Sequence, residues 1–347
     1  MATDFHYLKL KRKELDDMRI FIIADTHGLI DTGKIERFNF PEGYNLSKED
    51  IVIIGGDAGV IWDEDTDKTR IEYYENKPWT TVYVDGNHEN FTLLEQYEVV
   101  DFFGAKAHKI SDSIYHIRRG EIVVLNGKTF LCFGGGFSHD VSYRELDYDW
   151  FRQELPTQEE VDNAIHNLER YNYKVDYIIT HDVPFLHTTI LGYQNLKTYN
   201  IMEKYKGDVL YINIWDFLQQ QIFITTEYKA WFAGHYHRDQ KIHGIQLLFN
   251  GIAEITDGKE GYKILKSSIL EIMNRTYSKE ELREIFQKED LYMNYRKIGT
   301  IYDFGVYEPM MKATKYFDNQ VVEKQELEYI TKRYNEYCIQ KREKECT

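Results

Sequence analysis

The sequence of 347 residues contains only three cysteines, Cys132, Cys338 and Cys346. They are too few and too widely spaced for a disulfide framework, and none belongs to the Cys-x-x-Cys pair of a thiolate zinc site. Long hydrophobic runs are also missing. The longest apolar stretches, such as residues 20–24, have the length of a strand and are too short for a signal peptide or a membrane span. We therefore expect a cytoplasmic globular protein.

The chain also lacks an excess of positive charge. It has 43 Lys and Arg against 58 Asp and Glu, a net charge of −15 with histidine neutral. A protein that binds nucleic-acid duplexes tightly and without sequence preference presents a basic surface to the phosphates. The acidic balance argues against such binding, although it leaves room for a local positive groove.

Short apolar segments alternate with longer polar segments along most of the chain. The first apolar segment is the β-branched stretch 18–24, and polar segments such as 91–97 and 158–171 have helical patterns. Strands that alternate with helices are typical of a layered α/β architecture. Within 114–133, short strands follow one another directly, and the Asn-Gly pair at 126–127 predicts a tight antiparallel hairpin. Further strands are predicted at 51–54, 81–84, 177–180 and 231–233.

Composition divides the chain into three parts. Residues 1–17 are a charged lead-in, and residues 18–262 carry the alternating α/β pattern. Residues 263–347 lose the acidic excess, and the stretch 323–344 is rich in Glu and Lys with apolar residues at helical spacing, which predicts a mostly helical C-terminal appendage at 263–347. We therefore expect one α/β domain at 18–262 with an extension at each end. The roles of both extensions and the oligomeric state stay open.

Each of five predicted strands is followed directly by a short polar motif. In open α/β sheets, ligands bind beyond the carboxyl ends of the strands. These side chains should therefore gather at one edge of the sheet. The motifs are Asp25-Thr26-His27-Gly28, Gly55-Gly56-Asp57, Asp85-Gly86-Asn87-His88-Glu89, His181-Asp182 and Gly234-His235-Tyr236-His237.

The side chains in these motifs are of the types that bind metal ions. Aspartate, histidine and asparagine suit Mn, Fe, Zn or Mg, and no soft ligand accompanies them. They are too many for one ion with open positions, and they suit two ions that share a bridging carboxylate. Two metals about 3.5–4 Å apart can hold a phosphoryl group and activate a bridging water. The candidate ligands are Asp25, His27, Asp57, Asn87, His181, His235 and His237.

The motifs, in this order, resemble those of the calcineurin-like metallophosphoesterases over residues 18–250. The stretch Gly-Gly-Gly-Phe-Ser-His-Asp at 134–140, with Arg144 and Trp150, also resembles a bacterial subgroup of that family. The resemblance implies a four-layer α/β/β/α sandwich, with the mostly helical C-terminal extension outside it. The matching blocks are Asp-x-His at 25–27, Gly-Gly-Asp at 55–57, Gly-Asn-His-Glu at 86–89, His181 and Gly-His-x-His at 234–237.

The resemblance also implies roles for the motif residues. Asp57 would bridge two divalent ions, and a hydroxide held between the ions would attack phosphorus in line. His88 would face the substrate and protonate the leaving oxygen, as a histidine can near neutral pH. We expect manganese first, with iron, zinc, nickel and magnesium as alternatives. One ion would take Asp25, His27 and His237, and the other Asn87, His181 and His235.

The sequence departs from the protein-phosphatase branch of this family after the Gly-Asp motif. That branch continues as Gly-Asp-x-x-Asp-Arg-Gly, whereas Asp57 is followed here by Ala-Gly-Val-Ile. The Arg that grips phosphate and the carboxylate that orients His88 are therefore missing from this segment. We expect Arg144, or His139 with Asp140, to substitute for them as substrate-binding groups. Asn87 is the remaining substrate-binding candidate.

The sequence therefore predicts a metal-dependent phosphoric ester hydrolase. Its expected substrate is a phosphorylated small molecule or a nucleotide, because the chain is acidic and the Asp-Arg-Gly motif is missing. A phosphodiesterase or nuclease and a Ser/Thr-type protein phosphatase are the alternatives with the same metals. A catalytically inactive binding scaffold is disfavoured, since such a scaffold usually lacks some ligands or the histidine equivalent to His88.

Overall fold

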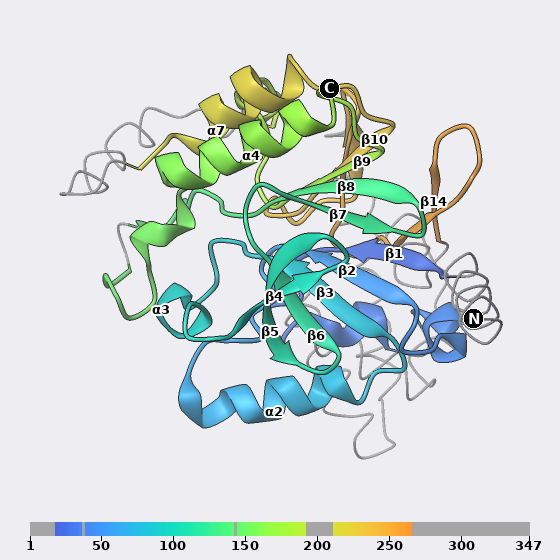
Figure 1. Cartoon of the computed structure of the whole chain (residues 1–347). Helices are drawn as coiled ribbons and strands as arrows, with labels where there is room; N and C mark the ends of the chain where they lie inside the picture. The colour runs from blue at the N-terminus through green and yellow to red at the C-terminus, as the bar shows by residue number, and fades with distance from the viewer. Residues whose placement is uncertain (1–17, 37–38, 142–143, 192–210, 266–347) are drawn as a thin grey trace, which may run out of the picture. The chain divides into compact units, whose positions relative to one another are not determined.

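The computed structural model describes residues 18–36, 39–141, 144–191 and 211–265 (Figure 1). The chain separates into two compact units, one of Met1–Gly28 with Leu46–Ile264 and one of Leu29–Asn45 with Leu265–Thr347. The described residues of the second unit form two 3-10 turns, η1 (Thr32–Ile35) and η2 (Pro41–Asn45). The predicted extension at 1–17 and the predicted appendage beyond residue 265 lie outside the described residues. All remaining elements belong to the first unit.

The larger sheet of the first unit has a parallel centre of buried strands. Ile20 pairs with Ile51 and Ile51 with Thr80, which aligns the first three strands in parallel. All three strands are buried along their whole length, because both faces of the sheet are covered. In spatial order the strands are β14 (Tyr262–Ile264), β13 (Ala253–Ile255), β1 (Ile20–Ile23), β2 (Ile51–Gly55), β3 (Thr80–Val84), β6 (Ile114–Ile117), β5 (Ala105–Ser111) and β4 (Val99–Phe102).

The second sheet begins with the hairpin that the sequence predicts. Asn126 and Gly127 join its two strands, and both have the positive φ (46° and 69°) that a tight two-residue turn requires. The next three strand pairs are parallel, and the pair at the far edge is antiparallel. In spatial order the strands are β11 (Gln240–Ile242), β12 (Ile245–Leu247), β10 (Ala230–Ala233), β9 (Tyr177–Thr180), β8 (Lys128–Phe133) and β7 (Glu121–Leu125).

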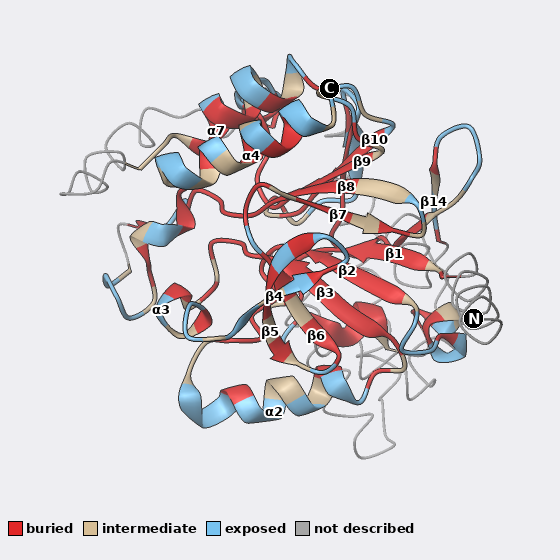
Figure 2. Cartoon of the chain, in the orientation of Figure 1, coloured by how far each residue is buried: buried red, intermediate tan, exposed pale blue. Residues whose placement is uncertain are grey.

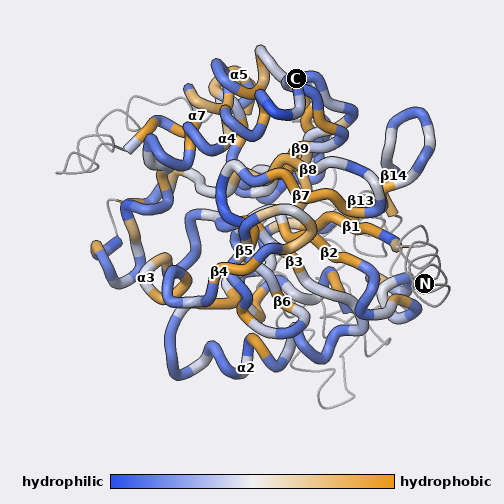
Figure 3. The backbone as a smooth tube through the Cα atoms, viewed as in Figure 1, coloured by the Kyte–Doolittle hydropathy of each residue, from blue (hydrophilic) through white to orange (hydrophobic). Residues whose placement is uncertain are grey.

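The two sheets pack face to face and helices cover their outer faces (Figure 1). Alternation along β9 shows this arrangement, because Tyr177 and Ile179 join the core between the sheets while Ile178 packs on the opposite side. On that side lie α4 (Gln158–Arg170) and α7 (Ile214–Phe217), whereas α2 (Glu64–Glu75) contacts β3, β5 and β6. Figures 2 and 3 show that the central strands of both sheets are buried and largely apolar, whereas edge strands such as β4 and β14 are partly exposed. The predicted four-layer α/β/β/α sandwich is confirmed.

The longer helices begin at side chains that cap them. Asp63 accepts from the Thr66 amide at the start of α2, and Thr157 and Glu160 cap each other's amides at the start of α4. The helix predicted at 91–97 is a single turn, α3 (Phe91–Leu94), because Glu95 already closes it. The other helical segments are η4 (Arg152–Glu154), α5 (Phe185–Ile190) and the π-helical turn η5 (Leu218–Phe223).

In the part of the chain that the structure describes, no helix combines the length and the apolar character needed to cross a membrane.

Candidate metal centre

The predicted ligands lie in the loops that follow β1, β2 and β3 of one sheet and β9 and β10 of the other. The sequence predicts a single sheet edge, but the structure brings these residues together from both sheets. The motif glycines allow the loops to approach. A Cβ added at Gly86 would overlap Asp57 Oδ1, and one at Gly56, where φ is +88°, would overlap the His181 ring. Side chains at these two positions would therefore push the ligands apart.

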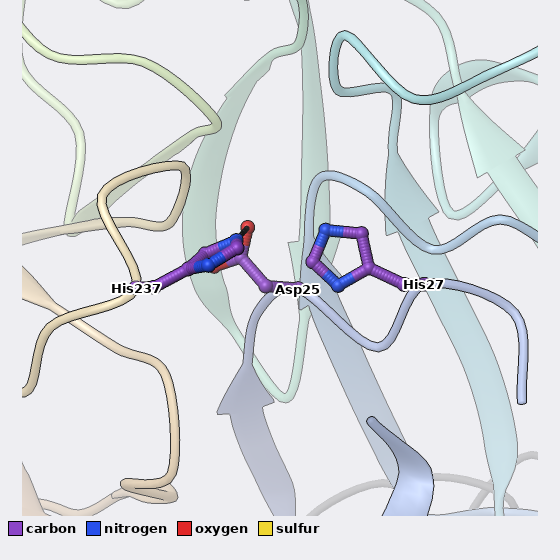
Figure 4. Close-up of side chains that lie close together, drawn as sticks. All are labelled: Asp25, His27 and His237. Atoms are coloured by element: carbon purple, nitrogen blue, oxygen red, sulfur yellow. Dashed lines mark ion pairs between the residues drawn. The ribbon is translucent and has the colours of Figure 1, made fainter. Parts of the chain in front are cut away.

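The first cluster consists of Asp25, His27 and His237. Each offers one ligand atom, and these atoms all lie within 4.8 Å of one another. Figure 4 shows the three side chains converging from the loops after β1 and β10. Asp25 is fully buried, and its two oxygens accept from the His235 amide at 3.0 and 3.1 Å. This bond ties the β10 loop to the β1 loop, so the trio predicted for one ion is brought together.

The second cluster surrounds Nε2 of His181. Asn87 Oδ1 lies 3.1 Å from this atom, His235 Nδ1 3.2 Å and Asp57 Oδ2 3.3 Å. The other ring nitrogen, His181 Nδ1, is 3.1 Å from the Gly55 carbonyl oxygen. This oxygen can only accept a hydrogen bond, so Nδ1 is the donor. Such a bond to the far nitrogen orients a histidine for metal binding through Nε2. The predicted ligands of the second ion therefore also converge.

Asp57 lies between the two clusters. Its Oδ2 is 3.2 Å from His27 Nε2 and 3.3 Å from His181 Nε2, while Oδ1 accepts from the His88 amide at 2.7 Å. Burial alone would raise the pKa of Asp57, but His181 and His88 outweigh burial and hold this pKa well below its usual range. Asp57 is therefore a buried carboxylate, ionised at neutral pH, in a position that both clusters share.

The electrostatics of the second cluster favour a cation. Burial lowers the pKa of His181, yet the Asp57 carboxylate outweighs burial and raises this pKa to about 9. A proton on His181 can therefore serve as the positive charge among these oxygen and nitrogen atoms. Burial and the neighbouring His181 hold the pKa of His235 well below its usual range, which keeps that ring neutral and able to bind metal. The residues present thus fit a pair of divalent ions.

His88 lies beside the clusters with Arg144 against its ring. Arg144 Nη2 is 3.1 Å from His88 Nε2, and Nη1 is 3.4 Å from Nδ1. Asp140 and the Asp149 carbonyl anchor the same guanidinium. Burial lowers the pKa of His88 to about 4, with Asp57 opposing this shift and His27 and Arg144 adding to it. The His88 ring is also within ligand reach of His27 and Asp57.

The structure separates the residues predicted to replace the missing phosphate-gripping arginine. Arg144 is next to His88, and Asp140 accepts from Arg144 Nε at 2.7 Å. His139 is displaced toward the second cluster, where its ring centroid lies 4.8 Å from that of His235. Arg144 is therefore the candidate that accompanies His88.

Several buried groups outside the predicted ligand set support the loops, and the sequence did not indicate their partners. Asp182 accepts from Trp215 Nε1 at 2.7 Å and from the Tyr236 hydroxyl at 2.6 Å, which connects the loops after β9 and β10 to α7. Asp182 and Asp85 stand within the polar motifs that follow the strands, at 181–182 and 85–89, and that position is the signal that points to them. Tyr236 lies inside the Gly-His-x-His motif, whereas Trp215, Arg119 and Glu154 lie in segments without a metal-binding motif.

The backbone at the ligands has an uncommon conformation. Five ligand residues have positive φ, a region that side chains other than glycine seldom adopt. The values are 56° at Asp25, 46° at His27, 50° at Asp57, 70° at His235 and 48° at His237.

A family model for calcineurin-like phosphoesterases matches residues 18–239. The match covers most of the chain and all predicted ligands, so this protein belongs to the calcineurin-like phosphoesterases, which are metal-dependent phosphoester hydrolases. No curated protein matched the chain as a relative. The bacterial subgroup suggested by the sequence stays a prediction.

Proposed function

We propose that this protein hydrolyses phosphate esters of small molecules or nucleotides at two divalent metal ions. The position of Asp57 carries the proposal, because one carboxylate oxygen lies 3.2 and 3.3 Å from the ligand nitrogens of the two clusters. When bound, the ions would polarise the ester and lower the pKa of a bound water toward neutrality. Manganese remains our first expectation, with iron, zinc, nickel and magnesium as alternatives.

The protein's own residues divide into two groups in this proposal. The first group holds the ions. One ion would be bound by Asp25, His27 and His237, the other by Asn87, His181 and His235, and Asp57 would be shared by both. His88 faces the substrate rather than an ion. A guanidinium within 3.4 Å of both ring nitrogens supports this assignment, because its permanent charge opposes a metal cation at the same ring.

His88 acts as the general acid for the leaving oxygen. In the protein without substrate its pKa of about 4 keeps the ring neutral at pH 7. A phosphate close to the ring would raise this pKa, since an opposite charge within about 4–6 Å favours the protonated form. A bound substrate thus favours the protonated form of His88, which is the form that acts as the acid. Arg144 holds a phosphate oxygen beside the His88 ring.

Two observations support a small substrate. The chain carries a net charge of −15, and the Asp-Arg-Gly segment of protein phosphatases is replaced by Ala-Gly-Val-Ile after Asp57. An acidic protein without that arginine is poorly suited to an extended polyanion. A small ester instead needs only the ions, His88 and Arg144.

The test is elemental analysis of the purified protein, followed by hydrolysis of p-nitrophenyl phosphate and bis-p-nitrophenyl phosphate after reconstitution with each ion. We expect about two ions per chain, as a two-metal site requires, and turnover of the monoester. Preference for the bis-ester would identify a phosphodiesterase instead. A chain that binds no ion and hydrolyses neither ester would overturn the proposal in favour of a binding scaffold.

A further inference from the structure

Asn87 is the only amide among the ligands predicted for the two ions, and its two ends are not equivalent. The amide oxygen binds divalent metals, whereas the NH₂ group is a pair of donors that repels them. A half-turn of the amide would therefore present the wrong end to His181 and its ion. Some other group must determine which end faces the site.

A hydrogen-bonded chain leads away from the nitrogen of this amide. Asn87 Nδ2 donates to Ser138 Oγ at 3.1 Å, and Ser138 Oγ donates to Glu154 Oε2 at 2.6 Å. The Ser138 amide donates to the other carboxylate oxygen, Oε1, at 3.0 Å. Asn87, Ser138 and Glu154 are at most 4% exposed, so water does not compete with these bonds. None of the motifs used to recognise the metal site includes Glu154.

The Glu154 carboxylate determines the donor-to-acceptor direction of both hydrogen bonds that lead to Asn87. Glu154 accepts the backbone N–H of Ser138, and as a carboxylate it also accepts the hydroxyl proton. The Ser138 oxygen then offers its lone pair to Asn87, which only the NH₂ end can use. Asn87 Oδ1 is left 3.1 Å from His181 Nε2, on the side of the second cluster.

The segment around Glu154 is held firmly enough to act as this anchor. The Glu154 carbonyl accepts from the Gly136 amide at 3.1 Å, and Arg119 Nη2 donates to the Gln153 carbonyl at 2.7 Å. A Cβ added at Gly136 would lie 2.9 Å from the His181 ring carbon Cδ2, so this loop approaches the ligands closely. Both the anchor and the serine are thus fixed relative to the site.

We propose that Ser138 and Glu154 are positioning residues that fix the orientation of the Asn87 amide, so that its oxygen faces the ion held by His181 and His235. The inference rests on the proposed two-metal function. It explains why a serine and a buried glutamate stand behind an asparagine ligand, and it assigns a role to the Gly-Gly-Gly-Phe-Ser loop. Outer groups of this kind typically contribute about 10- to 100-fold to metal affinity.

The first experiment titrates the metal-free protein with Mn²⁺ by calorimetry, in wild type and Ser138→Ala. We expect one of the two ions to bind about 10- to 100-fold more weakly in the variant, with the other unchanged. Ser113→Ala is the matched control, because Ser113 is also buried and its hydroxyl accepts from Lys48 at the opposite ends of the strands. The control should bind both ions as wild type does.

A second variant keeps the test valid if Ser138→Ala does not fold. Glu154→Gln has the same shape, but its NH₂ group can donate to the Ser138 hydroxyl, which then donates toward Asn87. The direction of the hydrogen bonds from Glu154 to Asn87 is then reversed, so the same single ion should bind more weakly.

A double variant separates orientation from general support. Asn87→Asp has an oxygen at both ends of the side chain, so its ligation does not depend on which end faces the ion. We therefore expect Ser138→Ala to cause no further loss of Mn²⁺ affinity in the Asn87→Asp background. An equal loss in both backgrounds would overturn the orientation role.

The outcomes also distinguish the inference from the function on which it rests. If wild type binds two ions and Ser138→Ala binds both with unchanged affinity, the orientation role is wrong while the metal site stands. If wild type binds no pair of ions, the proposed function itself fails.

Discussion

Replacing Arg119 with methionine should destabilise the protein strongly, because the arginine neutralises a carboxylate beneath the metal centre. Arg119 donates from Nε and Nη2 to Asp85 Oδ2 at 2.9 and 2.5 Å, and both side chains are at most 3% exposed. Burial would raise the pKa of Asp85, but Arg119 and His116 outweigh burial and hold this pKa below its usual range. Without the guanidinium, the carboxylate would stay buried with only His116 as a partner.

The expected loss follows from this burial. Removing one partner of a buried ion pair costs about 3–5 kcal/mol in the free energy of unfolding. For a domain of about 150–250 residues, each kcal/mol lowers the Tm by about 2–4 °C, so we expect a decrease of about 6–20 °C. The double variant Asp85→Asn with Arg119→Met should be more stable than Arg119→Met alone, since no unpaired charge remains buried.

The assay is thermal unfolding of the metal-free protein, followed by circular dichroism. Arg118→Met is the matched control, because the Arg118 side chain is 45% exposed and its nearest carboxylate, Glu95, is 4.0 Å away. An exposed pair of this kind contributes at most about 1 kcal/mol. Equal stability of the Arg118 and Arg119 variants would refute the reasoning. A double variant as unstable as Arg119→Met would trace the loss to packing rather than to charge.

Four further predictions concern single residues. His88→Ala should keep both ions by elemental analysis but lose about 10²–10⁴ in kcat, and a missing ion would contradict its role as the acid. Asp57→Asn should weaken both ions together in a metal titration, because one carboxylate serves both; loss of only one would exclude the bridge. Arg144→Ala should raise KM with metal content intact, and an unchanged KM for every ester tried would contradict a phosphate contact. For His108, burial, His116 and Arg118 lower the pKa from 6.5 to about 3, so the unfolded chain takes up a proton first as pH falls. Stability should therefore be lost from about pH 6.5 downward, by at most about 1.4 kcal/mol per pH unit, and His108→Phe should flatten the slope of unfolding free energy against pH.

The ligand set could be predicted from the sequence because each ligand belongs to a short motif directly after a strand. Asp25 and Asp57 each lie two residues beyond the end of an apolar β-branched strand, and the carboxyl ends of such strands are where ligands gather. The Asn126–Gly127 turn was predictable for the same reason, since positive φ at two successive residues has a specific sequence signal. These features depend on few residues and short distances along the chain.

The supporting groups could not be predicted because their partners are distant in sequence. Arg119 meets Asp85 across 34 residues and Glu154 meets Ser138 across 16. Nothing local distinguishes Glu154 from the many exposed glutamates of this acidic chain. The packing of two sheets decides which carboxylate is buried, and packing is not encoded in a motif.

The positive φ values at five ligands mean that the metal centre is maintained at a cost in stability. A left-handed residue with a Cβ costs about 1–2 kcal/mol, which glycine avoids. Selection for stability alone would therefore favour glycine at His27, His235 and His237. Asp25 and Asp57 also accept buried amide hydrogen bonds, and the loss of these bonds would offset the gain. Selection for catalysis retains a side chain at each of these turns. Descendants that no longer need the chemistry should be recognisable by glycines at the three histidine positions.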